Sequence, residues 1–291
     1  MQNFFDGAYK DRIGEISDRN ERTELHPLLQ TGRMELRRVA VDGRPVCCRV
    51  VGEGEDLVVL HGLSGSWRWW EPLMERLAER RRLYLVELPR LGRLRAGEMA
   101  PWLGRLLDAI GLGRVDILAH SLGGLVATEL ALEQPDRVRS LVLVAPAGVP
   151  CGRGVLERTL PLLEELYDVR ARLPTIIGDA IRMGPVSLVH GIAYVWERDL
   201  RGELSFVSAP TLLVWGERDR LVPSRVAEEW QRLLPRSRLV RLPCGHVPMW
   251  EAPGELASCV LEFLGDQLLD DSGEEAGLGV GDRVRLAGDD H

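Results

Sequence analysis

Ser121 stands at a point in the sequence where a serine hydroxyl could act as a nucleophile. It lies between an apolar run, 115–120, and a stretch of helical composition, 122–133, in the segment VDILAHSLGGLVA. A serine on a sharp turn from strand to helix needs small residues two positions away on each side, and here these are Ala119 and Gly123. The more ordinary interpretation is that the Ser121 hydroxyl caps the following helix. The pentapeptide alone leaves both interpretations open.

A nucleophilic serine also needs a base to take its proton and an acid to orient that base. Asp219 follows the apolar run 211–216, and His246 follows the run 238–243. Each has an ordinary explanation, since turns favour aspartate and many loop histidines serve only packing. Together they place Ser, Asp and His in this chain order, each after its own expected strand, as in enzymes whose nucleophile sits on such a turn. This agreement favours acyl-transfer chemistry.

The sequence His61-Gly62-Leu63-Ser64-Gly65 follows a further apolar run and supplies the fourth requirement, donors for a developing oxyanion. A glycine-rich turn allows a backbone N–H to point into the site. We expect the backbone N–H groups of Leu63 and Leu122 to serve as these donors. His61 is expected to fix this loop and not to take part in the reaction, and His120 is expected to point away from Ser121.

Strand and helix patterns alternate along most of the chain and would position these groups. The segment 35–52 reads as a hairpin with a tight turn at Asp42-Gly43. Further strands are expected at 57–62, 82–89, 115–120, 140–146, 211–216 and 238–243, and helices at 67–79, 100–110, 122–133, 224–234 and 253–269. This alternation predicts an α/β fold with a mostly parallel sheet buried between helices on both faces.

The alternation stops between residues 148 and 208, where the composition is helical and interrupted by prolines. We predict a helical cap at 148–208, inserted into one α/β core that comprises 34–147 and 209–269. An N-terminal arm at 1–33 and an acidic, flexible tail at 270–291 complete the expected organisation.

The composition is that of an average globular protein, with 45% hydrophobic and 28% charged residues in a chain of 291. Eight acidic residues and two arginines lie after residue 265, so nearly all of the net charge of −7 belongs to the tail. The rest of the chain is close to neutral, and we expect no nucleic-acid partner. The five cysteines lack the spacing of a metal site or redox motif. No signal peptide or membrane-spanning run is visible, so a cytoplasmic location is expected.

Four segments, HGLSGS, DAIGLGRVDILAHSLGGLVA, LVWGERDRLVP and GHVPMWE, together resemble the alpha/beta-hydrolase family, in particular its cap-bearing, esterase-like and lipase-like branch. The resemblance covers residues 35–268. It implies Ser121 as the nucleophile, His246 as the base and Asp219 as its orienting acid. Serine at the nucleophile position argues against the haloalkane dehalogenases and epoxide hydrolases of the family. The implied mechanism needs neither a metal nor an organic cofactor.

The chain departs from this family in a loop that borders the pocket of relatives. Members commonly carry a D-x-x-G-x-G-x-S stretch there, whereas this sequence reads ELPRLGRL, with Arg90 in place of a glycine and Leu94 in place of the serine. We expect Trp67, Arg90 and Trp196 to line a substrate pocket, although tryptophans of this kind often only pack a cap onto its core.

The sequence therefore predicts a serine hydrolase that cleaves a small to medium apolar ester through an acyl-enzyme, with water as the second substrate. A carbon–carbon bond hydrolase acting on a dienoate is an alternative, and Arg90 or Arg182 could then bind the substrate carboxylate. Acyl transfer to another acceptor, including perhydrolysis, is a further alternative. A non-catalytic ligand-binding protein on the same fold is the alternative outside enzymes.

Overall fold

A computed structural model describes residues 33–92, 96–151 and 170–271 of the chain. The predicted arm at 1–33 and the predicted tail at 270–291 lie almost wholly outside these described residues. Residues 152–169 also lie outside them, so the predicted cap is described only in part.

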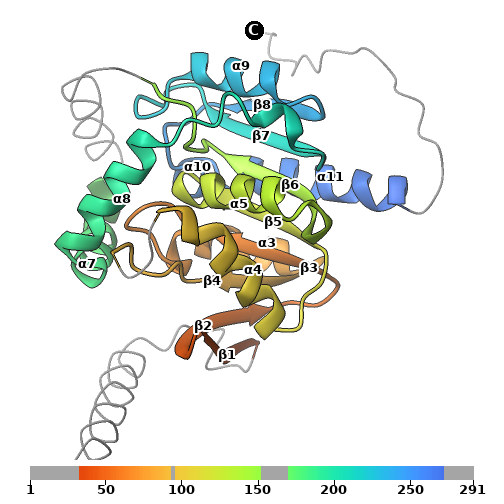
Figure 1. Ribbon diagram of the computed structural model, residues 1–291. Coiled ribbons are helices and arrows are strands. Elements are labelled where there is room, and N and C mark those ends of the chain that lie inside the picture. The colour runs from red at the N-terminus through yellow and green to blue at the C-terminus, as the bar shows by residue number, and fades with distance from the viewer. Residues whose placement is uncertain (1–32, 93–95, 152–169, 272–291) are drawn as a thin grey trace, which may run out of the picture.

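An eight-stranded sheet forms the centre of the molecule, with the strand order β1-β2-β4-β3-β5-β6-β7-β8 (Figure 1). Strands β1 and β2 form the expected antiparallel hairpin, and β2 pairs antiparallel with β4, while all later pairs are parallel. Asp42 and Gly43 both have positive φ, 52° and 71°, as a two-residue hairpin turn of this kind requires. The strands are β1 Met34–Val41, β2 Arg44–Val51, β3 Glu55–Leu60, β4 Arg81–Val86, β5 Val115–His120, β6 Val138–Val144, β7 Thr211–Gly216 and β8 Ser237–Leu242.

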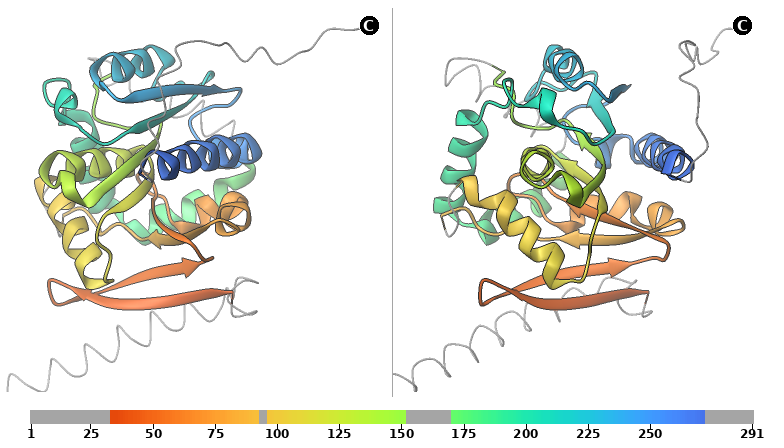
Figure 2. Two further views of the ribbon diagram at one scale, coloured as in Figure 1. Left: turned by 90° about the vertical axis from the view of Figure 1, so that its right-hand side faces the viewer. Right: turned by 45° about the vertical axis from the view of Figure 1, so that its right-hand side comes forward.

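Helices cover both faces of this sheet, as the sequence predicts (Figure 2). One face packs against α4, Met99–Ala109, α5, Leu122–Glu133, and α9, Ser224–Leu233. The other face packs against α3, Glu71–Ala78, and α11, Pro253–Asp271. Side chains of a buried strand alternate between the two layers, which explains why the central strands are apolar throughout.

Strand β6 shows this alternation directly. Leu141 and Leu143 belong to the core layer under α4 and α5, whereas Val142 and Val144 belong to the layer under α3 and α11. All four side chains are fully buried. The sheet is therefore held from both sides, and the loops at its ends are anchored to a rigid base.

The predicted helix at 67–79 is in fact two elements, a 3₁₀ turn η1 at Trp67–Trp70 followed by α3. Pro72 lies in the first turn of α3. Because proline lacks an N–H, it fits the start of a helix and not its interior, and the α-helix begins there.

Within the predicted cap, the described residues form α7, Leu173–Met183, and α8, Pro185–Glu197, joined by Gly184 at φ 82°. The two helices lie at one end of the sheet (Figure 1). A Cβ placed on Gly191 of α8 would come within 2.3 Å of Leu63 and 3.2 Å of Leu91, in the loops that follow β3 and β4. The helices thus lie over the carboxyl ends of the strands. That 148–208 form a separate cap unit stays a prediction.

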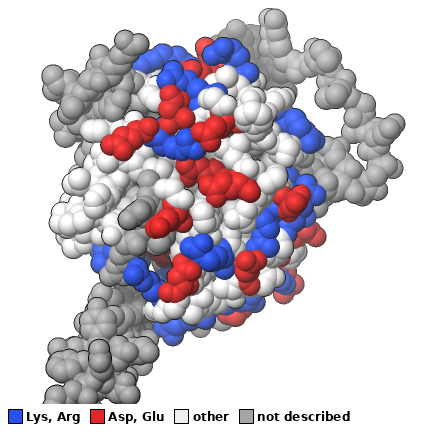
Figure 3. Space-filling view, viewed as in Figure 1, with Lys and Arg blue, Asp and Glu red and all other residues white. Residues whose placement is uncertain are grey.

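On the face seen in Figure 3, Lys and Arg side chains alternate with Asp and Glu, and no broad area carries a single sign of charge. No helix among the described residues is long and apolar enough to cross a membrane. Helices α7 and α8 carry four exposed apolar side chains, Ile177, Ile181, Val186 and Val189.

Candidate active site

Ser121 occupies a strained turn between β5 and α5. Its φ of 49° and ψ of −113° are rarely adopted by residues other than glycine, and such a conformation costs about 1–3 kcal/mol. Three backbone hydrogen bonds hold it: the Ser121 N–H donates to Val144, 3.0 Å, and its carbonyl accepts from Leu125, 3.1 Å, and Ala147, 3.0 Å. The turn is thus fixed by β6, by the loop that follows β6 and by α5.

The Ser121 hydroxyl does not cap α5, although Ser121 occupies the residue before the helix. The capping interpretation therefore does not account for this serine. Its neighbours must be small for steric reasons that the structure makes specific. A Cβ on Gly123 would lie 2.6 Å from the carbonyl oxygen of His61, and one on Gly124 would lie 2.8 Å from Pro146.

Asp219 and His246, which follow β7 and β8, form a hydrogen-bonded pair. His246 Nδ1 lies 2.8 Å from Asp219 Oδ2, and the other carboxylate oxygen accepts the N–H of Val222 at 2.8 Å. Both residues are buried. Because a carboxylate only accepts, this bond places the proton on Nδ1 and leaves Nε2 as the basic nitrogen of a neutral ring.

His120 connects this pair to the serine turn. Its Nε2 donates to the backbone carbonyl of His246 at 2.9 Å, and the centres of the two imidazole rings are 4.8 Å apart. The pKa of His120 lies well below its usual value, mainly because the ring is buried and further because His246 is near. His120 is therefore neutral and holds His246 through its backbone, a contact that the sequence did not predict.

The turn at Gly62-Leu63-Ser64-Gly65 is closed by a bond from the Gly65 N–H to the Gly62 carbonyl, 3.1 Å, with Ser64 at φ 54°. His61 ties this turn down, since its Nδ1 donates to the Gly62 carbonyl at 2.8 Å and its Nε2 accepts the Leu88 N–H at 3.1 Å. Both ring nitrogens are thus engaged with backbone, as expected for a histidine that fixes a loop.

The two predicted oxyanion donors come from this turn and from α5. A Cβ on Gly62 would lie 3.2 Å from the Ser121 Cβ, so the turn passes close to the serine. Leu122 is the first residue of α5, and the first four N–H groups of a helix have no partner within it. That Leu63 and Leu122 bind an oxyanion stays a prediction.

The three predicted pocket residues occupy different environments. Trp67 is buried, with the Arg49 guanidinium 4.6 Å from its ring centre. Arg90 is exposed in the loop after β4, and Trp196 is half-buried on α8. Their role in substrate binding stays a prediction.

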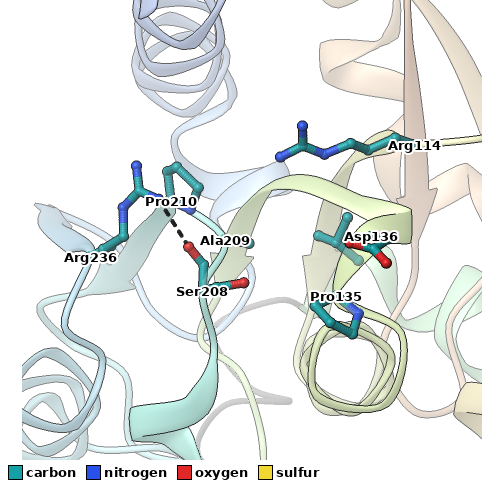
Figure 4. A pocket seen from close by; sticks show the side chains of 8 residues that line it. Arg114, Pro135, Asp136, Ser208, Ala209, Pro210 and Arg236 are labelled. Atoms are coloured by element: carbon teal, nitrogen blue, oxygen red, sulfur yellow. Dashed lines mark hydrogen bonds between the residues drawn. The ribbon is translucent and has the colours of Figure 1, made fainter. Parts of the chain in front are cut away.

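A hollow of about 440 Å³ lies at the amino ends of the parallel strands (Figure 4). Val138 at the start of β6, Pro210 immediately before β7 and Arg236 immediately before β8 line it. Because these are the amino ends of parallel strands, the hollow is remote from Ser121, Asp219 and His246. It is not the space in which these three groups would act. No group of three or more His, Cys, Asp or Glu side chains in the described segments is placed to hold a metal ion.

Comparison with known proteins shows the family of this chain. The sequence matches the alpha/beta hydrolase family over residues 57–258. The chain belongs to this family. It is similar to the pimeloyl-[acyl-carrier protein] methyl ester esterase of Nitrosomonas europaea, with 34% identity over 72% of this chain and 95% of that protein. The esterase of the same name from Aeromonas hydrophila is 32% identical over 74% of this chain and 97% of its own length.

Among solved structures, a bacterial membrane phospholipase A has a similar fold, with a TM-score of 0.68 and 25% identity over 92% of this chain and 99% of that one. The alpha/beta-hydrolase fold and the hydrolase class predicted from the sequence are therefore confirmed. The roles of the individual residues are not decided by these similarities.

Proposed function

We propose that this hydrolase is a serine esterase in which Ser121 attacks the ester carbonyl, His246 takes its proton and Asp219 orients His246. The hydrogen bond of 2.8 Å between His246 and Asp219, beside the strained turn of Ser121, is the observation that carries this proposal. The N–H groups of Leu63 and Leu122 receive the oxyanion.

In the first step, the Ser121 oxygen bonds to the ester carbon as its proton moves to His246 Nε2. The tetrahedral intermediate then loses its alcohol, which takes the proton from His246, and an acyl-enzyme forms. A water molecule then attacks the acyl-enzyme carbonyl as its proton moves to His246 Nε2. The second tetrahedral intermediate collapses to the acid, and His246 returns the proton to the departing Ser121 oxygen. Asp219 stabilises the imidazolium in both steps.

The substrate class follows from the relatives, whose name states that they act on the methyl ester of pimeloyl-[acyl-carrier protein]. We propose that this chain cleaves an ester of a small alcohol and a medium-length acyl chain. The apolar side chains on α7 and α8, which lie over the strand ends, are consistent with an apolar acyl group.

Carbon–carbon hydrolysis of a dienoate would need a cation to bind the substrate carboxylate. Arg182, one of the two candidates, pairs with Asp179 on its own helix. This pairing makes Arg182 a weaker cation for that purpose. Arg90, the other candidate, is exposed in the loop after β4. We prefer the esterase because the relatives are named as esterases.

The test compares the wild type with Ser121→Ala on p-nitrophenyl esters of increasing acyl length and on dimethyl pimelate, a carrier-free substitute. We expect a burst of one equivalent of nitrophenol or steady turnover from the wild type, and a loss of at least about 10³-fold in kcat in the variant. Ser208→Ala, in the hollow at the amino ends of the strands, is the matched control and should keep wild-type kcat.

Equal turnover by the wild type and Ser121→Ala would overturn the proposal. Saturable ligand binding without any turnover would instead favour the non-catalytic alternative. Added alcohols or hydrogen peroxide distinguish hydrolysis from acyl transfer, since they divert the acyl group only if an acceptor other than water is used.

A further inference from the structure

Asp179 on α7 is a buried carboxylate that joins the predicted cap to the core. It is 4% exposed, and its Oδ2 accepts hydrogen bonds from Ser66 Oγ at 2.8 Å and from Trp69 Nε1 at 3.0 Å. It also pairs with Arg182 one turn further along the helix. A buried carboxylate is costly unless it is paired and hydrogen-bonded, so this site favours the arrangement in which α7 lies against the core.

The two core donors belong to the segment that immediately follows the turn at 62–65. Ser66 is fully buried, and it is the next residue after Gly65, whose N–H closes that turn. A second contact reinforces the first, because Gly191 of α8 packs closely against the side chain of Leu63. Helices α7 and α8 therefore contact the proposed oxyanion turn at Leu63 and the residue that follows the turn, Ser66.

Trp69 extends the same connection toward the proposed base. Its ring centre lies 5.9 Å from that of His120 and 4.7 Å from that of Trp250. His120 in turn donates to the carbonyl of His246. One carboxylate on α7 thus contacts the segment that follows the proposed oxyanion turn and, through the Trp69 ring, approaches the residue that supports His246.

We propose that Asp179 is a positioning residue that holds the oxyanion turn in its active geometry when α7 lies against the core. This inference rests on the proposed function, because it concerns the kcat of the proposed esterase reaction. Oxyanion donors act only when they lie about 2.7–3.1 Å from the developing charge, so a small shift of the turn reduces kcat. Asp179 touches Ser66 and Trp69 and does not contact the reacting atoms.

Glu129 provides a matched comparison, because it is a second buried carboxylate between the core and α8. It accepts the hydroxyl of Tyr194 and pairs with Arg198 at 2.7 Å. Glu129 lies two turns into α5 and has no contact with Ser66 or Trp69 among these bonds. Removing it breaks the bonds to Tyr194 and Arg198 and leaves the bonds of Asp179 to Ser66 and Trp69 in place.

The experiment measures kcat and KM for p-nitrophenyl acetate, a substrate too short to depend on contacts with α7 and α8. The proteins are the full-length wild type, Ser121→Ala, Asp179→Ala, Ser66→Ala, the double variant of Asp179 and Ser66, and Glu129→Ala. We expect Asp179→Ala to lose tenfold or more in kcat with KM within twofold of the wild type. Ser66→Ala should lose a smaller factor, because Asp179 keeps its bond to Trp69 in that variant. The double variant should lose no more than Asp179→Ala, because removing Asp179 already breaks the bond to Ser66.

Glu129→Ala should keep kcat within twofold of the wild type. Wild-type kcat in Asp179→Ala, or an equal loss in Glu129→Ala, would overturn the inference, as would a double variant whose losses multiply. If Asp179→Ala does not fold, Trp69→Phe and Ser66→Ala each remove one donor and should each lower kcat without changing KM. If Ser121→Ala is as active as the wild type, the proposed function fails. If Ser121→Ala is inactive but Asp179→Ala keeps wild-type kcat, only the inference about Asp179 fails.

Discussion

The histidine beside Ser121 shows how one residue type serves two purposes in the same site. His120 and His246 both lie near the serine, but only His246 is bonded to a carboxylate. His120 is fully enclosed and donates to a backbone carbonyl, so its chemistry is that of a fixed hydrogen-bond donor. Burial separates the two roles, because desolvation opposes the charged form of His120.

This burial predicts a dependence of stability on pH. The pKa of His120 is lowered in the folded protein, so the unfolded chain binds the extra proton as the pH falls below the unfolded value of about 6.5. His120 therefore lowers the free energy of unfolding on acidification, by up to about 1.4 kcal/mol per pH unit. In His120→Gln this loss is absent, so the stability advantage of the wild type should shrink between about pH 7 and about pH 5. Urea denaturation at both pH values measures it, and an unchanged difference would contradict the burial argument.

At the scale of elements, the loops after β7 and β8 must meet for Asp219 to reach His246. Gly216, the last residue of β7, makes this possible. A Cβ there would lie 2.0 Å from the carbonyl oxygen of Gly245 and 2.6 Å from that of Cys244. Both contacts are to backbone, so neither can be relieved by the rotation of a side chain.

We expect Gly216→Ala to push the His246 loop away from Asp219. The free energy of unfolding should fall by about 1–3 kcal/mol, and esterase kcat should fall more than KM rises. Gly265→Ala on α11 is the control, because nothing lies within 4 Å of its added Cβ. That variant should keep its activity and gain up to about 1 kcal/mol. Thermal denaturation and ester turnover measure both effects, and a fully active Gly216→Ala would show that the loops tolerate separation.

At the scale of the whole molecule, the carboxyl and amino ends of the strands carry different groups. The carboxyl ends of the strands carry Ser121, Asp219 and His246. The amino ends carry a buried ionic cluster around Asp116, which is 1% exposed and lies 2.9 Å from Arg81 and 2.7 Å from Arg139. The Ser140 hydroxyl donates to the same carboxylate at 2.6 Å.

Asp116→Ala should therefore affect stability and not the reaction. It leaves the buried Arg81 without its charge partner, at a cost of about 3–5 kcal/mol. The kcat per folded molecule should stay within about twofold of the wild type, since the carboxyl ends of the strands, which carry Ser121, are untouched. Asp108→Ala, which removes an exposed partner of Arg137, should cost no more than about 1 kcal/mol. Denaturation together with active-site titration tests this prediction. A large loss of kcat in Asp116→Ala would show that the amino ends of the strands also affect the reaction.

The sequence by itself determined the local elements and the order of the candidate residues. Strands β5 and β7 and helix α5 begin and end at the predicted residues, because apolar periodicity and turn residues are local properties of the chain. Ser121, Asp219 and His246 became candidates because each follows its own strand, and parallel strands bring their carboxyl ends together.

Only the tertiary structure decided which distant groups meet. Asp179 and Ser66 are 113 residues apart, and Arg81 and Asp116 are 35 residues apart, so no local pattern connects them. The strained φ of Ser121 and the bond from His120 to the His246 carbonyl likewise depend on how β5, β6 and β8 are placed. These contacts follow from strand order and from the packing of helices over the sheet, which are set by the burial of the whole chain and not by any single segment.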